Sequence, residues 1–325
     1  MTKVANIQLL RFLAALMVVI SHICSNITTL STQPESGIWR EVSVLGSYGV
    51  DIFFTISGFV IAQSFIRNQR TPIEFAILRF FRIFPLYATA TGTFYLSHAF
   101  FPGLMQNSLV DNKLLFSSLT FTSDIFGYSF PYLPQGWTLE VEVFFYLLFG
   151  IAIFVFQFSN KNPYRVANFT VGLLVICILL GAPFVMFEFI LGIGLAITLY
   201  KSRFQKLLYL FLVFVLALFG LFKVLVWFQN PQILVGALST LLLYLVINSP
   251  EVKAKLSYFL GDISYSVYLL HGMTIAALLK VFNFFGSSSI PYFFCIVFFL
   301  VILISIATYV FFEKPINNFA RNLII

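Results

Sequence analysis

Charged residues are scarce in this sequence: only 10% of its 325 residues are Asp, Glu, Lys or Arg, whereas 60% are hydrophobic. A typical soluble domain carries about 25% charged residues, and so little polar surface cannot cover a water-soluble globule of this size. A soluble enzyme and a disordered chain are therefore excluded. The composition, with 43 Phe residues, predicts a protein that lies in a lipid bilayer and contacts membrane lipids.

Cysteine is scarce as well, and its placement excludes two kinds of site. Cys24, Cys177 and Cys295 are the only cysteines, each lies in an apolar stretch, and no CxxC spacing occurs. Such a set builds neither a zinc site nor a disulfide framework. We therefore expect no bound metal, and we expect the cysteines to pack as small apolar side chains.

Long apolar runs, in contrast, are abundant. A transmembrane helix needs about 20 predominantly apolar residues, and the chain contains ten such stretches. These stretches are residues 7–27, 48–66, 83–101, 137–158, 166–182, 184–200, 206–227, 232–248, 262–284 and 291–312. We therefore expect an all-α polytopic membrane protein of ten transmembrane helices, folded as a single integral-membrane domain over residues 1–325.

The basic residues between these stretches predict the orientation, because cytoplasmic segments of membrane proteins carry an excess of Lys and Arg. Of the 19 basic residues, 15 fall on one side: Lys3, Arg11, Arg67, Arg70, Arg79, Arg82, Lys161, Arg165, Lys201, Arg203, Lys206, Lys253, Lys255, Lys314 and Arg321. Both termini are therefore expected in the cytoplasm. The long outer segments are residues 28–47 and 102–136, and a half-apolar run at 114–121 is a candidate for a short re-entrant or surface helix.

Ionisable residues inside the apolar stretches are costly in lipid and therefore indicate a functional site. Arg11 and His22 share one face of the first helix, because eleven residues at about 100° each make almost three full turns. His22, Asp51 and Glu142 fall at similar depths, toward the outer ends of three different helices. Trp137 lies just outside Glu142, as an interfacial anchor does. The sequence thus predicts a convergence of one histidine and two carboxylates near the outer face.

The inner side of the same helices has a different character. Arg79 and Arg82 are one turn apart at the cytoplasmic mouth of the third predicted helix, and with Arg11 they form a basic cluster suited to phosphate groups. Ser57 and His271 lie near mid-membrane. The result is a polar track that is basic at the inner mouth and carries histidine and carboxylates near the outer face.

This track suits one kind of chemistry. A histidine with a carboxylate partner can take a proton from a hydroxyl group, because the carboxylate fixes the tautomer and stabilises the imidazolium. A phosphate-bearing donor at the inner mouth needs a long arm, since half of the hydrocarbon thickness is about 15 Å. The pantetheine arm of coenzyme A can cover that distance. We therefore expect acyl transfer across the membrane, with acyl-CoA entering from the cytoplasm and a hydroxyl acceptor from the other side.

Six motifs, in order along the chain, resemble those of the membrane acyltransferase-3 family. They are Arg-x10-His within residues 6–22, GVDIFFTISGF at 49–59, RFFRIFPLY at 79–87, GWTLEVE at 136–142, ISYSVYLLH at 263–271 and FEKP at 312–315. The resemblance covers nearly the whole chain and is closest to exopolysaccharide O-acetyltransferases of the succinoglycan type, which are single ten-helix domains. It implies a multi-pass enzyme of the bacterial cytoplasmic (inner) membrane. Such an enzyme moves an acetyl or similar short acyl group from its CoA thioester to a hydroxyl of a cell-surface or lipid-linked polysaccharide.

The resemblance and the depth argument together give the expected site. Arg11 and His22 match the pair that the family needs for activity. The expected catalytic residues are His22, Arg11, Asp51 and Glu142; the expected donor-binding residues are Arg79, Arg82, Ser57 and His271; Trp137 is expected on the acceptor side. The neighbouring Glu140 leaves open which carboxylate functions, although the spacing from Trp137 favours Glu142.

The expected ligands follow from the same reading. Acetyl-CoA, or another acyl-CoA, is a co-substrate, and no permanently bound cofactor is expected. A glycan or lipid-linked oligosaccharide is the expected acceptor, nucleic acid is not a partner, and a homo-oligomer is left open.

Alternative interpretations remain. Membrane-depth histidine and carboxylates also build proton relays, so a proton-coupled transporter is one alternative, and a non-catalytic subunit of polysaccharide export is another. Asp51 can instead cap its helix, and Arg79 and Arg82 can merely set topology. Ser57 can bond its own helix, and His271 a neighbouring one. Six ordered motifs, without two related halves of the transporter kind, favour the enzyme.

Overall fold

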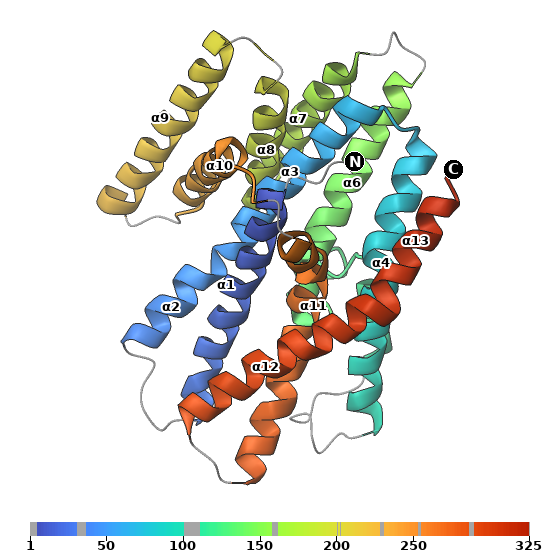
Figure 1. Cartoon of the computed structure of the whole chain (residues 1–325), viewed down its shortest axis with the longest axis vertical. Helices are drawn as coiled ribbons and strands as arrows, with labels where there is room; N and C mark the ends of the chain where they lie inside the picture. The colour runs from blue at the N-terminus through green and yellow to red at the C-terminus, as the bar shows by residue number, and fades with distance from the viewer. Residues whose placement is uncertain are drawn as a thin grey trace. The chain divides into compact units, whose positions relative to one another are not determined.

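The computed structural model describes residues 5–30, 37–100, 111–157, 162–199, 201, 203–227, 231–252, 255–285 and 289–324, of which 28–30 and 226–227 are described by their backbone only. Every regular element in these ranges is a helix (Figure 1). The α-helices are α1 (Ala5–Leu30), α2 (Ile38–Ser47), α3 (Gly49–Asn68), α4 (Pro72–Phe100), α5 (Asn112–Leu119), α6 (Trp137–Phe156), α7 (Pro163–Leu179), α8 (Phe187–Thr198), α9 (Arg203–Trp227), α10 (Gln232–Asn248), α11 (Lys255–Phe284), α12 (Ile290–Thr308) and α13 (Lys314–Asn322). The 3-10 turns η2 (Pro134–Gly136) and η3 (Phe184–Met186) precede α6 and α8, and the π-helical η4 (Tyr309–Glu313) joins α12 to α13.

The helices confirm an all-helical membrane protein. Within the described ranges, six helical segments are long and apolar enough to cross a membrane: Ala5–Ile27, Ile38–Asn68, Pro134–Phe156, Arg203–Leu225, Lys255–Phe284 and Ile290–Asn322. Three more apolar helices are shorter: Pro163–Leu179, Phe184–Thr198 and Gln232–Asn248. Each of the ten predicted stretches overlaps a helix, although the ends differ. The number of spans and the side on which the termini lie stay predictions.

Helix α4 begins eleven residues earlier than the apolar run at 83–101 predicts. Its start is set by a capping box, in which the Thr71 N–H donates to Glu74 Oε2 (2.9 Å) and the Glu74 N–H donates to Thr71 Oγ1 (3.3 Å). Pro72 occupies the first helical position, where a missing N–H costs nothing. Arg79 and Arg82 therefore lie within α4 rather than at its mouth.

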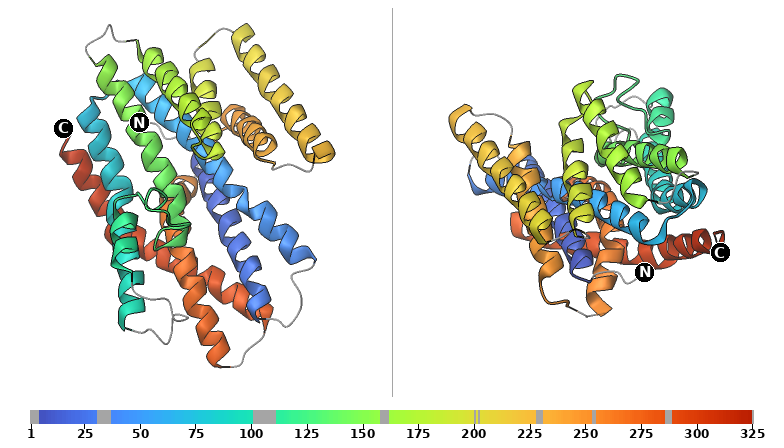
Figure 2. Two further views of the ribbon diagram at one scale, coloured as in Figure 1. Left: turned by 180° about the vertical axis from the view of Figure 1, so that it is seen from behind. Right: turned by 90° about the horizontal axis from the view of Figure 1, so that it is seen from above.

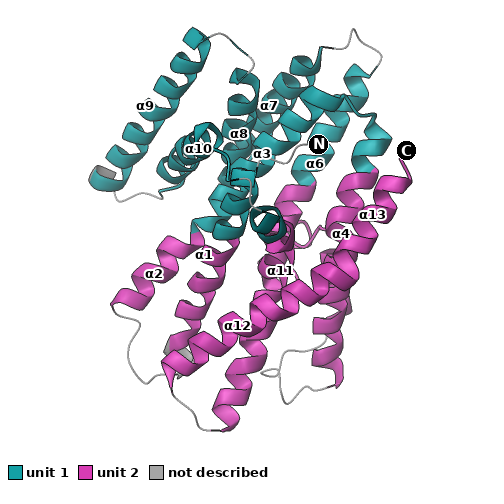
Figure 3. Ribbon diagram, viewed as in Figure 1, with its two compact units in different colours: residues 1–14, 48–76, 144–261 teal, residues 15–47, 77–143, 262–325 magenta. Residues whose placement is uncertain are grey.

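The chain divides into two compact units (Figure 3). Unit 1 comprises residues 1–14, 48–76 and 144–261, and unit 2 comprises residues 15–47, 77–143 and 262–325. Each unit is assembled from three stretches that are distant in sequence, so neither is a segment of chain that was appended to the other. The assignment of residues 1–325 to a single domain stays a prediction.

Unit 1 is organised around close packing of α3 against α8, which lie side by side in every view (Figures 1 and 2). A Cβ atom on Gly58 would overlap the backbone of Phe189, and one on Gly192 would overlap the carbonyl of Thr55. Small residues allow helix backbones to approach in membranes, where association depends on packing rather than on the hydrophobic effect. Phe189 also stacks on Phe145, with ring centroids 4.2 Å apart.

Unit 2 is organised around residues 262–272 of α11. The Tyr265 hydroxyl donates to the carbonyl of Ile83 on α4 (2.8 Å). Two hydrogen bonds join the stretch to the η2–α6 segment: Gln135 Nε2 donates to the Leu269 carbonyl (2.8 Å), and the hydroxyls of Tyr268 and Thr138 lie 2.7 Å apart. The Tyr309 hydroxyl of η4 donates to the carboxylate of Asp262 (3.0 Å). A polar side chain in the hydrocarbon region stays unpaired unless a neighbouring helix offers it a hydrogen-bond partner. This stretch of α11 thus fixes the helices that surround it.

The predicted short helix in the outer segment is present as α5, while residues 102–110 lie outside the described ranges. Asp111 caps it by accepting hydrogen bonds from the backbone N–H groups of Lys113 (2.8 Å) and Leu114 (3.0 Å). These bonds favour the charged carboxylate and lower the pKa of Asp111.

Candidate active site

The first candidate site group is a pair of histidines in unit 2. Nδ1 of His22, on α1, lies 2.6 Å from Nε2 of His271, on α11. The rings are 21° from coplanar with centroids 4.8 Å apart, so they meet edge to edge through the facing nitrogens. On its other side, Nδ1 of His271 lies 2.5 Å from the carbonyl oxygen of Tyr268. His271 is fully buried, whereas His22 is partly exposed.

This contact differs from the depths expected of the two histidines. The sequence places His22 near the outer face and His271 near mid-membrane, because the apolar run of the latter begins at residue 262. The helix that carries His271 begins at Lys255 instead, so the apolar run is a poor reference for the depth of His271. The structure thus brings together a residue expected to be catalytic and one expected to bind the donor.

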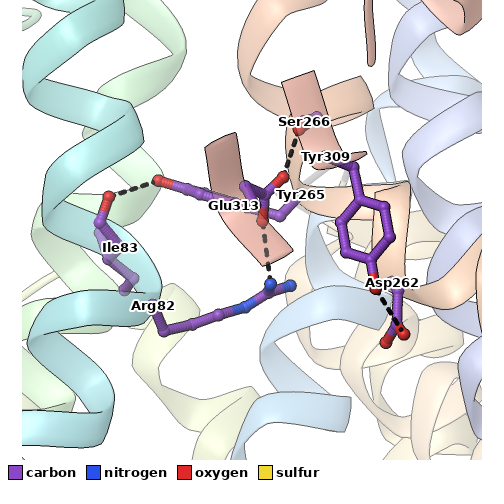
Figure 4. Close-up of polar contacts among 7 residues, drawn as sticks. All are labelled: Arg82, Ile83, Asp262, Tyr265, Ser266, Tyr309 and Glu313. Atoms are coloured by element: carbon purple, nitrogen blue, oxygen red, sulfur yellow. Dashed lines mark hydrogen bonds and ion pairs between the residues drawn. The ribbon is translucent and has the colours of Figure 1, made fainter. Parts of the chain in front are cut away.

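The second group is an ion pair next to the same stretch of α11 (Figure 4). Nη1 of Arg82 lies 3.0 Å from Oε2 of Glu313, and the hydroxyl of Ser266 donates a hydrogen bond to the other carboxylate oxygen. The guanidinium also lies over the ring of Tyr265, 5.2 Å from its centroid. The side chain of Glu313 is 3% exposed and that of Arg82 is 22% exposed, so the carboxylate is buried and the cation reaches the surface of the described structure.

Glu313 owes its place to a local change of helix type. It is the last residue of the π-helical segment η4, and Tyr309, the first residue, donates a hydrogen bond to Asp262 of α11. Single π-helical turns within α-helices occur frequently at functional sites. Ser266 and His271 are five residues apart on α11, about 7.5 Å along the axis. One helix therefore supports both the histidine pair and the ion pair.

The third group is a carboxyl pair in unit 1. Asp51, near the start of α3, lies close to Glu188, in the first turn of α8. Two neighbouring buried carboxylates repel each other when both are charged. Glu188 is 1% exposed, and Gly236 of α10 leaves room for its side chain, since a Cβ there would lie 3.2 Å from Glu188 Cγ.

The remaining expected residues are distributed over both units. Arg11 and Ser57 are partly buried on α1 and α3 in unit 1, while Arg79 lies on α4 one turn before Arg82 in unit 2. Trp137 is the first residue of α6, and Glu142 lies five residues later on the same helix.

The two neighbouring glutamates differ in their partners. Oε1 of Glu140 accepts a hydrogen bond from the Ser123 N–H at 3.1 Å, which ties the outer segment to α6. Glu142 lies two residues further along α6 and so projects from a different face of the helix. The choice of Glu142 over Glu140 as a site residue stays a prediction.

Sequence reasoning missed Glu188 and Glu313 as site candidates. Glu188 lies in an apolar stretch, so the argument that selected Glu142 would have selected it too. Glu313 lies beyond the end of an apolar run, within the FEKP motif, and its pairing with Arg82, 231 residues away, shows what its carboxylate contacts. Among the residues that the structure describes, no group of three His, Cys, Asp or Glu side chains could hold a metal ion.

The site thus combines a pair of contacting imidazoles with an arginine–glutamate ion pair on helices that adjoin α11, and comparison with known proteins gives the class. The acyltransferase-3 family, described as an acyltransferase domain, matches residues 4–310. The chain belongs to this family of membrane acyltransferases.

Individual relatives are named for related activities. The chain is 31% identical to the exopolysaccharide production protein ExoZ of Rhizobium meliloti (strain 1021), over 85% of this chain and 91% of ExoZ. It is 32% identical to the O-acetyl transferase of Shigella phage Sf6, over 44% of each chain. It is 30% identical to the peptidoglycan O-acetyltransferase OatA of Listeria monocytogenes, over 39% of this chain and 23% of OatA. No solved structure gives a significant match.

Proposed function

We propose that the protein transfers an acetyl or another short acyl group from acyl-CoA to a hydroxyl of a cell-surface or lipid-linked polysaccharide. The observation that carries this proposal is the contact of His22 with His271, because a held imidazole on a membrane-embedded helix is a candidate general base. The membership of the acyltransferase-3 family supports the reaction class, and the names of ExoZ and the two O-acetyltransferases support a glycan acceptor.

The proposed reaction is a direct transfer. His22 takes the proton of the acceptor hydroxyl, the oxygen attacks the thioester carbonyl, and the new C–O ester bond forms as the C–S bond breaks. The CoA thiolate leaves and takes the proton from the His22 imidazolium, which restores the neutral base. The products are the O-acyl glycan and free CoA. Glu142 is proposed to stabilise the charged imidazole, and Trp137, on the same helix, to meet the acceptor.

The donor is proposed to bind through its phosphates. Arg79 and Arg82 supply cationic, multidentate groups of the kind that recognise phosphate. Arg11, on the same helix face as His22 and about 16 Å along the axis from it, is proposed to serve the same donor. Ser57 is proposed as a further donor contact and Asp51 as a further participant in the reaction.

The proposed setting is the bacterial cytoplasmic membrane, crossed ten times with both termini inside. The positive-inside distribution of 15 of the 19 basic residues supports this topology. Single cysteines introduced at residue 40 and residue 165 in a cysteine-free background test it. Only the former is expected to react with an impermeant maleimide in intact cells.

The function is tested with the detergent-purified protein and acetyl-labelled acetyl-CoA. The wild type is expected to cleave the thioester and, with polysaccharide present, to move the label to it, whereas His22→Asn should do neither. His98→Asn is the matched control, because within the described ranges the His98 Nδ1 bonds the carbonyl of Phe94 on its own helix (2.8 Å) and Asn can replace that bond. Intersecting initial-rate patterns are expected for direct transfer, whereas parallel lines would indicate an acyl-enzyme. A wild type that neither binds nor cleaves acyl-CoA would remove the proposal.

A further inference from the structure

We propose that His271 is a positioning residue that fixes the tautomer of His22, so that Nε2 of His22 is the atom that takes the proton. This inference deepens the proposed function and rests on it. It replaces the expectation that His271 binds the donor, and it replaces the expectation that a carboxylate orients the base.

The argument begins at the carbonyl of Tyr268. A carbonyl oxygen can only accept a hydrogen bond, so the nitrogen that lies 2.5 Å from it, Nδ1 of His271, must carry the proton. A neutral imidazole has one N–H group and one lone pair. Nε2 of neutral His271 is therefore an acceptor.

The second step determines which nitrogen of His22 carries the proton. Nδ1 of His22 lies 2.6 Å from Nε2 of His271, a distance at which one of the two nitrogens donates. Because Nε2 of His271 accepts, Nδ1 of His22 donates. Neutral His22 then carries its lone pair on Nε2, and an added proton on Nε2 leaves the same hydrogen bond in place.

If Nε2 of His271 instead donated to Nδ1 of His22, His271 would carry protons on both nitrogens and would be charged. That ring is 0% exposed, and one of its nitrogens faces a neutral carbonyl. Burying an imidazolium without a paired anion is costly. The geometry therefore selects a neutral His271 that accepts from His22.

The surroundings of His271 hold this chain of hydrogen bonds in place. The hydroxyl of Tyr268 bonds both Thr138 (2.7 Å) and the carbonyl of Gln135 (3.2 Å), which fixes the residue whose carbonyl orients His271. Nε2 of Gln135 in turn donates to the carbonyl of Leu269 (2.8 Å). Gly272 makes room for Gln135, since a Cβ at this position would lie 2.7 Å from its Nε2.

A pair of variants separates positioning from donor binding. The amide oxygen of Gln can occupy the place of the imidazole Nε2, whereas the shorter Asn reaches only the place of Nδ1. His271→Gln should therefore retain the acceptor for His22 and most of kcat. His271→Asn should keep the bond to Tyr268 but lower kcat about 10- to 100-fold, the range that applies when the partner orienting a metal-bound histidine is lost, with KM for acetyl-CoA unchanged. A raised KM with unchanged kcat in His271→Asn would overturn the inference.

Ring nitrogen NMR provides a readout that does not depend on activity. The chain has only three histidines, so a 15N-histidine-labelled sample is assigned with single variants of His22, His98 and His271. In the wild type at neutral pH, His22 should be protonated at Nδ1 and unprotonated at Nε2, and His271→Asn should change the His22 signals while leaving those of His98. A wild-type His22 protonated at Nε2 alone would overturn the inference even if His22→Asn is inactive, in which case the proposed function would stand.

Discussion

Nη1 of Arg82 and Oε2 of Glu313 are 3.0 Å apart, although the two residues are separated by 231 positions in the sequence. The guanidinium is thereby held over the ring of Tyr265 while its carboxylate partner is anchored by Ser266. A buried carboxylate that has a second hydrogen bond can keep its place when the arginine also contacts a phosphate. We therefore propose that Glu313 orients the guanidinium of Arg82.

The first prediction concerns this ion pair and the donor. Arg82→Ala should raise KM for acetyl-CoA by about 10-fold or more, because a hydrogen bond to a charged group contributes about 1.5–3 kcal/mol. The fall in kcat should be small, since Arg82 is assigned to donor binding. Steady-state kinetics at varied acetyl-CoA measures both.

The reversed pair, Arg82→Glu with Glu313→Arg, is the matched control. It should recover the thermal stability that either single reversal loses, because the opposite charges face each other again. It should not recover donor affinity, since the arginine then lies on the other helix. Recovery of donor affinity in the double variant would show that Arg82 has only a structural role.

A second prediction concerns the packing of α3 against α8. Gly192→Ala should destabilise the protein by about 1–3 kcal/mol, because the added methyl group overlaps the Thr55 carbonyl and the helices must separate. Gly172→Ala, on α7, has open space around the added Cβ and should leave stability within about 0.5 kcal/mol. The thermal unfolding midpoints of both variants are measured in the same detergent. Equal midpoints for the two variants would contradict the close packing of α3 against α8.

A third prediction concerns the support of the histidine pair. Gly272→Ala should displace Gln135 and lower kcat, because the Gln135 bond to the Leu269 carbonyl lies beside His271. Gly92→Ala, on α4, meets no atom within 4 Å and serves as the control. Wild-type kcat in Gly272→Ala would mean that the position of Gln135 has no influence on the base.

A fourth prediction separates the two members of the carboxyl pair. Asp51→Asn and Glu188→Gln each replace an ionisable group by a neutral one of the same size, so both should keep the stability of the wild type. Asp51→Asn should lower the acyl-transfer rate, whereas Glu188→Gln should not, because only Asp51 is assigned to the reaction. Equal rates in the two variants would remove Asp51 from the site.

The apolar runs were sufficient to predict which segments are helical, but not where the helices begin. An apolar run marks the residues that suit hydrocarbon, whereas a helix start is set by caps such as Thr71 and Glu74. The same holds for His271: its expected depth counts from residue 262, whereas α11 begins at Lys255.

The site was only partly predictable for a related reason. Periodicity shows which residues share a face of one helix, as for Arg11 and His22, but it does not show which helices meet. The pairing of His22 with His271 joins residues 249 positions apart, and Glu313 is placed by a π-helical turn that leaves no mark in hydropathy. Such contacts are decided by tertiary packing.

The central claim is that His22 drives acyl transfer to a surface glycan. Its most direct test is mass spectrometry of surface polysaccharide from a bacterial strain that lacks the gene and carries the wild type, His22→Asn or His98→Asn at equal membrane levels. We predict O-acyl groups with the wild type and with His98→Asn, and their absence with His22→Asn. Wild-type acylation in the His22→Asn strain, or none in the wild-type strain, would contradict the account.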